Sequence, residues 1–113
     1  MKINPILNKY STNETRIGTW TDGKPIYRKV ISIGTLPGSS GAKNTAHGIS
    51  NIGTLIRIYG FAYSGGTRFP LPYTTNVNSN NIALYANNTN VIVEVGQSRS
   101  GYTAYAILEY TKN

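Results

Sequence analysis

The residue types that usually carry catalysis are scarce in this chain. Its 113 residues include one histidine, four carboxylates and no cysteine. Acid–base, nucleophilic and metal-assisted chemistry all draw on these residue types. A chain without cysteine also has neither disulfides nor thiolate metal ligands, so its core or an oligomer must supply the stability. The composition therefore predicts a protein that is not an enzyme and that holds no cofactor or metal.

Three motifs resemble active sites, and each lacks something that the chemistry requires. His47 has no carboxylate near it in the sequence, so we expect it to order its loop by hydrogen bonding or packing. The alternative is a metal held on a trimer axis by three copies of His47. The segment Gly38–Asn44 resembles a phosphate-binding loop, but Asn44 stands where Ser or Thr should bind magnesium. Glu94 and Glu109 lie in strand-like runs and could approach one another, yet nothing distinguishes an acid from a base.

Aromatic rings and an arginine gather in the segment from Tyr63 to Tyr73. Two glycines and two prolines in it are typical of a loop, and loops often carry binding residues. Ring faces stack on the apolar faces of sugars, and a guanidinium binds hydroxyl, carboxylate or phosphate oxygens. In the alternative interpretation, the rings fold inward and fix a long loop. The predicted ligand-binding residues are Tyr63, Arg68, Phe69 and Tyr73.

The formal charge of +7 comes from eleven basic residues against four acidic ones. This balance attracts polyanions, among them the phosphate- or carboxylate-bearing glycans of bacterial surfaces, although scattered charge also serves solubility alone. Nucleic acid is not an expected partner, because the basic residues form no dense run and few strand-like runs pair them with rings. No long apolar segment follows the start of the chain. We therefore expect synthesis in the cytoplasm, no signal peptide and no membrane partner.

The elements that must position these residues read as strands joined by turns. Glycine, threonine, asparagine, serine and tyrosine are abundant, which disfavours long helices. The runs 16–20 and 24–33 flank Asp22-Gly23, a signal for a two-residue hairpin turn with positive φ at Gly23. Trp20, beside this turn, is predicted to be a buried packing anchor.

Further along, the run 54–63 is the clearest strand, with Leu55, Arg57, Tyr59, Phe61 and Tyr63 on one face. Runs 82–86 and 91–95 predict a second hairpin and 102–110 a last strand, whereas 34–51 and 64–81 read as loops. About six strands at this spacing predict an antiparallel β-sandwich of jelly-roll type. The length allows one domain, 16–113, preceded by a lead-in or linker, 1–15.

The pattern "YST-E…G-W-DGKP-Y-K", "AHGI-NI" and "AY-ILEYTK" runs through the chain, at Tyr10–Lys29, Ala46–Ile52 and Ala104–Lys112. It resembles the small C-terminal domains of phage and prophage tail fibre or baseplate proteins. The resemblance implies a virion protein, a homotrimer, contacts with other tail or baseplate proteins, and binding to a host cell-surface glycan. It also implies subunit contacts near Tyr105, Ile107 and Tyr110. The alternative is a trimerisation or assembly module with no receptor binding of its own.

Overall fold

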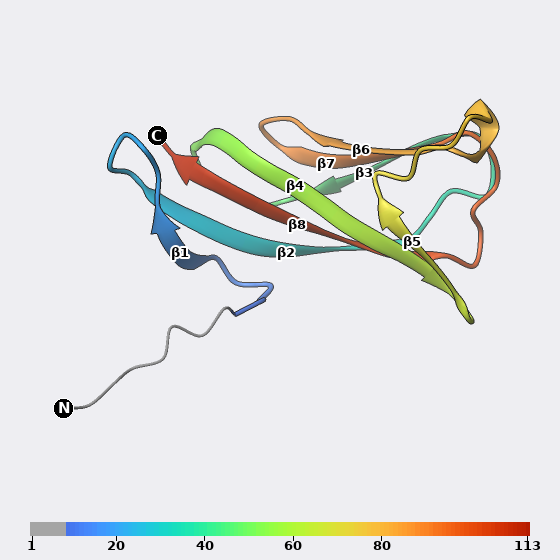
Figure 1. Cartoon of the computed structure of the whole chain (residues 1–113), viewed down its shortest axis with the longest axis horizontal. Coiled ribbons are helices and arrows are strands. Elements are labelled where there is room, and N and C mark those ends of the chain that lie inside the picture. The colour runs from blue at the N-terminus through green and yellow to red at the C-terminus, as the bar shows by residue number, and fades with distance from the viewer. Residues whose placement is uncertain (1–8) are drawn as a thin grey trace.

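The chain folds into two antiparallel β-sheets that lie face to face (Figure 1). The computed structural model describes residues 9–113. The larger sheet has five strands in the order β1-β2-β8-β4-β5. These strands are β1 (Thr15–Thr19), β2 (Pro25–Thr35), β8 (Thr103–Lys112), β4 (Ile52–Ser64) and β5 (Thr67–Leu71). The predicted all-β antiparallel sandwich is confirmed.

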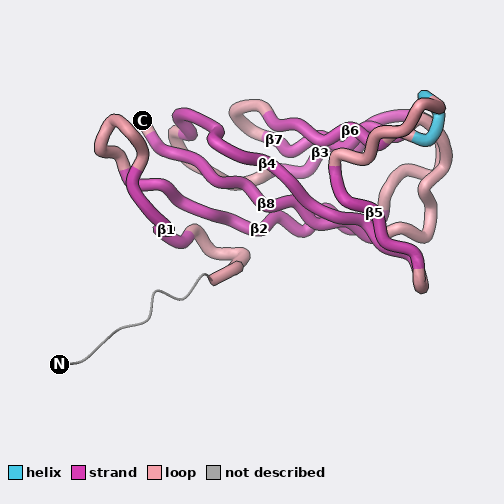
Figure 2. Tube along the Cα trace, in the orientation of Figure 1, coloured by secondary structure: helices cyan, strands magenta, loops and turns pink. Residues whose placement is uncertain are grey.

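The smaller sheet has three strands in the order β3-β7-β6. These strands are β3 (Gly41–Ala46), β7 (Asn90–Val95) and β6 (Ile82–Ala86). In each sheet a late strand lies between two earlier ones, β8 between β2 and β4 and β7 between β3 and β6, which gives the jelly-roll-like interleaving. One short 3-10 turn, Asn78–Asn80, lies between β5 and β6 (Figure 2). No helix within residues 9–113 is long and apolar enough to cross a membrane.

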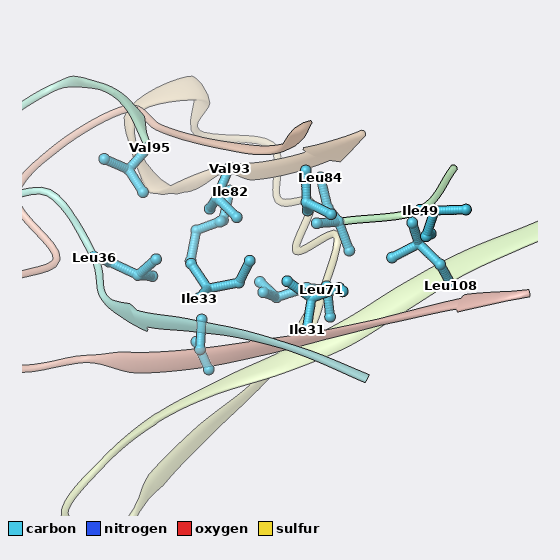
Figure 3. Close-up of a cluster of buried hydrophobic side chains, with 14 of the residues drawn as sticks. Ile31, Ile33, Leu36, Ile49, Leu71, Ile82, Leu84, Val93, Val95 and Leu108 are labelled. Carbon is cyan, nitrogen blue, oxygen red and sulfur yellow. The ribbon is translucent and has the colours of Figure 1, made fainter. Parts of the chain in front are cut away.

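The hydrophobic core fills the space between the two sheets (Figure 3). Successive side chains of a strand point to opposite faces, so alternate residues of each strand reach this core. Val91, Val93 and Val95 enter it from β7, and Leu108 and Tyr110 enter it from β8. Tyr110 is fully buried there. The Tyr110 side chain itself is therefore closed to a neighbouring subunit, whereas subunit contacts of the terminal strand near Tyr105 and Ile107 stay a prediction.

The Asp22-Gly23 hairpin is present, with a loop one residue longer than predicted. The backbone amide of Trp20 donates to the carbonyl of Lys24 at 2.8 Å, and Gly23 donates back to Trp20 at 3.0 Å. Three residues therefore lie between the bonded pair Trp20 and Lys24. Gly23 has the predicted positive φ, +90°, and Asp22 does not share it. The Asp22 side chain instead accepts the amide of Lys24 at 2.9 Å.

Trp20 is partly buried and lies outside the core cluster. It follows β1, an edge strand whose only partner among the described strands is β2. A ring at the end of an edge strand is covered from fewer directions than one in the middle of a sheet. Trp20 was predicted to be a buried packing anchor, and the structure shows a partly buried ring at the hairpin.

Two segments predicted as loops contain strands: β3 lies within 34–51 and β5 within 64–81. Both are edge strands, and both pair along their whole length with a longer or more apolar neighbour, β3 with β7 and β5 with β4. An edge strand needs hydrogen bonds on one side only, so β5 tolerates Pro70. Pairing with a neighbour, rather than local propensity, makes these segments strands.

A bulge in β4 changes one of the predicted faces. Leu55 pairs with Tyr110, but Arg57 pairs with Glu109, so β4 uses two residues where β8 uses one. This extra residue turns Leu55 toward the core, although the sequence predicted it on the face of Arg57. From Arg57 to Tyr63 the predicted alternation is confirmed.

The last residues of the lead-in contact the sandwich. The backbone amide of Val30 in β2 donates to the carbonyl of Ser11 at 2.8 Å. Glu14 accepts a hydrogen bond from Tyr110 and pairs with Lys112. Residues 1–8 of the predicted lead-in lie outside the described residues, and the domain boundary at residue 16 stays a prediction.

We expect Gly23→Val to lower the free energy of unfolding by about 1 to 3 kcal/mol, because a β-branched residue is strained at positive φ. No heavy atom lies within 4 Å of the Cβ that the substitution would add, so only backbone strain acts. Gly66→Val is the matched control, since its Cβ position is equally open and its φ is not positive. Urea denaturation measures both variants. Equal stability of the two would contradict the strained conformation at Gly23.

Candidate functional site

The structure divides the four predicted ligand-binding residues between the two faces of the larger sheet. Tyr63 and Arg68 pair across β4 and β5 and are exposed on the outer face. Phe69 pairs with buried Ala62 and therefore points inward. Its ring centroid lies 4.4 Å from that of Tyr73, and both rings pack against the core. The four side chains do not form one site.

Phe69 belongs to a cluster that closes one end of the sandwich. Its ring lies 5.4 Å from that of Tyr102, and the guanidinium of Arg99 lies 5.2 Å from its centroid. Arg99 is buried and donates to the backbone carbonyl of Asn80 at 2.5 Å. A buried cation over aromatic faces that also satisfies a loop carbonyl holds loops together. This cluster is structural, as the inward-folding interpretation of the segment proposed.

The outer face of the larger sheet carries a hollow that we call the aromatic groove. Its volume is about 460 Å³, within the range of ligand pockets. The groove combines rings and aliphatic side chains from β2, β4 and β8 with one ring from the lead-in. Its lining residues are Tyr10, Val30, Tyr59, Phe61, Tyr105 and Ile107.

The pleat of β4 and its register with β8 explain why these side chains meet. Tyr59 pairs with Ile107 and Phe61 with Tyr105, so all four share the outer face. The Phe61 ring lies 5.5 Å from that of Tyr105, at 27°, and 6.2 Å from that of Tyr63, at 28°. Three neighbouring rings with nearly parallel planes therefore form a strip. Phe61 and Tyr63 are 42% and 38% exposed.

The backbones of β4 and β8 approach each other closely at Gly60. A Cβ added to Gly60 would lie 2.1 Å from the backbone carbonyl oxygen of Tyr105. No side chain fits there, so β4 lies directly against β8 beneath the rings.

A buried ion pair forms the polar end of the groove. Arg28 in β2 donates from Nε to Glu109 Oε2 at 2.9 Å and from Nη2 at 2.8 Å. The Tyr59 hydroxyl donates to the same carboxylate at 3.2 Å. The guanidinium of Arg28 stacks 4.4 Å from the centroid of Tyr10. Removing one partner of such a pair costs about 3 to 5 kcal/mol, because the other charge stays buried and alone.

Tyr10 is a wall of the groove because the lead-in is held at two points. The Ser11 carbonyl continues the ladder of β2, and Glu14 accepts the Tyr110 hydroxyl at 2.6 Å. Lys112 pairs with the same carboxylate at 3.2 Å. Burial and the hydrogen bond to Glu14 raise the pKa of Tyr110. Burial, the Tyr10 hydroxyl and the charge of Glu109 raise the pKa of Tyr59.

The histidine and the two glutamates that were candidates for catalysis all form hydrogen bonds or ion pairs within the fold. His47 is buried, accepts the Ile49 amide at Nδ1 at 3.0 Å and donates from Nε2 to the Asn87 carbonyl at 3.0 Å. It orders its loop, as expected. Glu94 accepts the Tyr85 hydroxyl on the smaller sheet, whereas Glu109 lies on the outer face of the larger one. The two carboxylates therefore do not face each other.

No metal centre emerges from the described part of the chain. Within residues 9–113 no three side chains of His, Asp or Glu gather closely enough to hold an ion. A second hollow of about 340 Å³ is polar and lacks rings and charges. It is lined by Asn51, Ile52, Asn88 and Asn113.

Sequence reasoning missed most of the groove. Tyr59, Phe61 and Tyr63 were placed on one face by alternation, and that signal already indicated a ring-bearing strand. The sequence does not show which strand pairs with β4, so Tyr105 and Ile107 of β8 could not be assigned to the same surface. Tyr10 was counted with the linker and not with the domain.

Comparison with known proteins gives no relative for this chain. A scan against family models found no match, and searches of curated proteins and of solved structures found none at the significance required. A proposal for the groove must therefore rest on its own geometry and charge.

We expect Tyr59 and Tyr110 to resist ionisation until the pH is well above about 10, the range of free tyrosine. A raised folded-state pKa stabilises the fold fully below that pH and loses its effect as the pH rises. Absorbance titration of tyrosinate, compared with Tyr59→Phe and Tyr110→Phe, measures the late step. Each substitution should reduce its amplitude. Ionisation of all nine tyrosines in one early step, with native circular dichroism, would contradict these environments.

Proposed function

We propose that this chain is a non-enzymatic module of a phage or prophage tail fibre or baseplate. In this proposal it binds a glycan of the bacterial host surface through the aromatic groove. The sequence pattern over residues 10–112 supports the virion context. The groove supports the binding role.

The observation that carries the binding role is the strip of Tyr63, Phe61 and Tyr105. The plane of the Phe61 ring lies within 28° of each of the other two planes, and Phe61 and Tyr63 are exposed. Sugars present apolar C–H groups, and exposed rings that their neighbours hold in place can contact these groups without rearrangement. Hydroxyl groups at Tyr63 and Tyr105 can bond the sugar hydroxyls at the rim.

The hollow favours a ligand over a second copy of the same face. In a two-fold interface the same surface meets itself. Two copies of the groove would then place hollow against hollow and leave about twice its volume of 460 Å³ unfilled. Empty space of that size forfeits the contacts on which association depends. A chain-like ligand seated on the rings fills the hollow instead.

Phe61→Ala should weaken binding about tenfold, since a ring contact contributes on the order of 1 to 1.5 kcal/mol. The melting temperature should stay unchanged, because the side chain is exposed. A glycan array of bacterial surface polysaccharides identifies the ligand, and calorimetry measures the affinity. Tyr85→Ala is the matched control, with a ring 44% exposed on the smaller sheet. Equal affinities of the two variants would remove the groove from the proposal.

Two of the ligand-binding residues predicted from the sequence, Arg68 and Tyr73, can be tested with the same ligand. Arg68→Ala should weaken binding at an unchanged melting temperature, because Arg68 is exposed. Tyr73→Ala should lower the melting temperature without a specific loss of affinity, because Tyr73 packs on the core.

The alternative function is a trimerisation or assembly module, and the exposed apolar strip is the observation that favours it. We propose a homotrimer in either case, so light scattering at micromolar concentration should give three times the 12.3 kDa of one chain. Phe61→Ala should stay trimeric if the groove holds a ligand. A monomeric variant would instead assign the groove to the subunit interface. A monomeric parent chain would contradict the trimer itself.

A further inference from the structure

We infer that the ligand of the aromatic groove is an anionic polysaccharide that lies along β4 and reaches from Arg57 to Arg68. The inference rests on the proposed function and adds the charge and the shape of the ligand. It follows from which charges on the outer face are already neutralised and from the distance between those that are not.

The charged side chains of the outer face are three arginines and one glutamate. Register places Arg57 opposite Glu109 and Arg68 opposite Tyr63 on that face. Glu109 is already bonded by Arg28 and by the Tyr59 hydroxyl. Within residues 9–113 neither Arg57 nor Arg68 forms a salt bridge. Two arginines therefore leave the face positive, and both are exposed.

The two arginines are already oriented by their surroundings. The guanidinium of Arg57 stacks 4.1 Å from the centroid of Tyr59. Arg68 is held through Nη1 by the backbone carbonyl of Gly66 at 3.3 Å. In both, other N–H groups stay open, and a guanidinium offers five donors that suit carboxylate or phosphate oxygens.

Their separation sets the length of the ligand. Arg68 lies opposite Tyr63, six positions beyond Arg57 along β4. At about 3.3 Å per residue the arginines are about 20 Å apart. Tyr59, Phe61 and Tyr63 fill the interval on the same face. A single sugar cannot reach both arginines, whereas a chain of several sugars contacts both and stacks on the rings between.

The same spacing disfavours single-stranded nucleic acid, which also stacks on rings. Each nucleotide carries a phosphate, and nucleic-acid grooves line the backbone with closely spaced cations. Two arginines about 20 Å apart leave the intervening phosphates without partners. A polysaccharide with spaced carboxylates or phosphates matches this arrangement better.

The test uses the full chain on an array of acidic and neutral bacterial polysaccharides, followed by calorimetry with oligosaccharides of increasing length from the bound one. We expect binding to acidic polysaccharides, affinity that rises until the oligosaccharide spans the arginines, and weaker binding at high salt. Combined Arg57→Gln and Arg68→Gln should lower affinity about tenfold. Combined Arg16→Gln and Lys24→Gln removes the same charge from the exposed β1–β2 hairpin and should leave affinity unchanged.

Different outcomes of this test contradict the inferred ligand alone or the proposed glycan-binding function as well. Binding to neutral polysaccharides only, equal affinity for a monosaccharide and its oligomers, or equal effects of the two double variants would overturn the inference and leave the glycan-binding function standing. A folded chain that binds no polysaccharide, or that prefers a single-stranded oligonucleotide, would overturn both.

Discussion

Strand β8 is the constraint on which the rest of the structure depends. It is hydrogen-bonded to β2 and to β4, and the side chains on both of its faces have a structural role. Its inward residues, among them Leu108 and Tyr110, complete the core, and its outward residues, Tyr105 and Ile107, form the floor of the groove. The one carboxylate on its outer face, Glu109, is tolerated because Arg28 neutralises it. Fold and candidate site therefore share one strand and one register.

The sequence predicted the elements that contain strong local signals. Alternation located the strand from Arg57 to Tyr63, and Asp22-Gly23 located the first hairpin with its positive φ. Edge strands β3 and β5 were missed, because their polar, proline-containing segments become strands only beside β7 and β4. The inward turn of Leu55 depends on a bulge, which needs knowledge of the partner strand. The groove was missed for the same reason, since no local pattern shows which strand lies beside Phe61.

The two outer faces of the sandwich differ in what they offer to other molecules. Along the larger sheet, two exposed arginines flank a row of rings beside a hollow. On the smaller sheet Tyr85 is the large exposed ring, and its hydroxyl already bonds Glu94. A ring tied to a neighbouring carboxylate presents less free hydrogen-bonding capacity than Tyr63 or Tyr105. Because of this asymmetry, we propose the larger sheet, and not the smaller one, as the binding face.

The anchoring of the lead-in gives the groove a mechanical property. Tyr10 precedes both attachment points, the Ser11 contact to β2 and the Glu14 contacts to Tyr110 and Lys112. Tension applied ahead of residue 9 reaches Tyr10 first and the sheet only after these contacts yield. Stretching the chain from that side would peel the ring away from Arg28 and widen the groove before any strand separates. If the groove holds a polymer as proposed, pulling on this side of the chain would weaken its grip on that polymer.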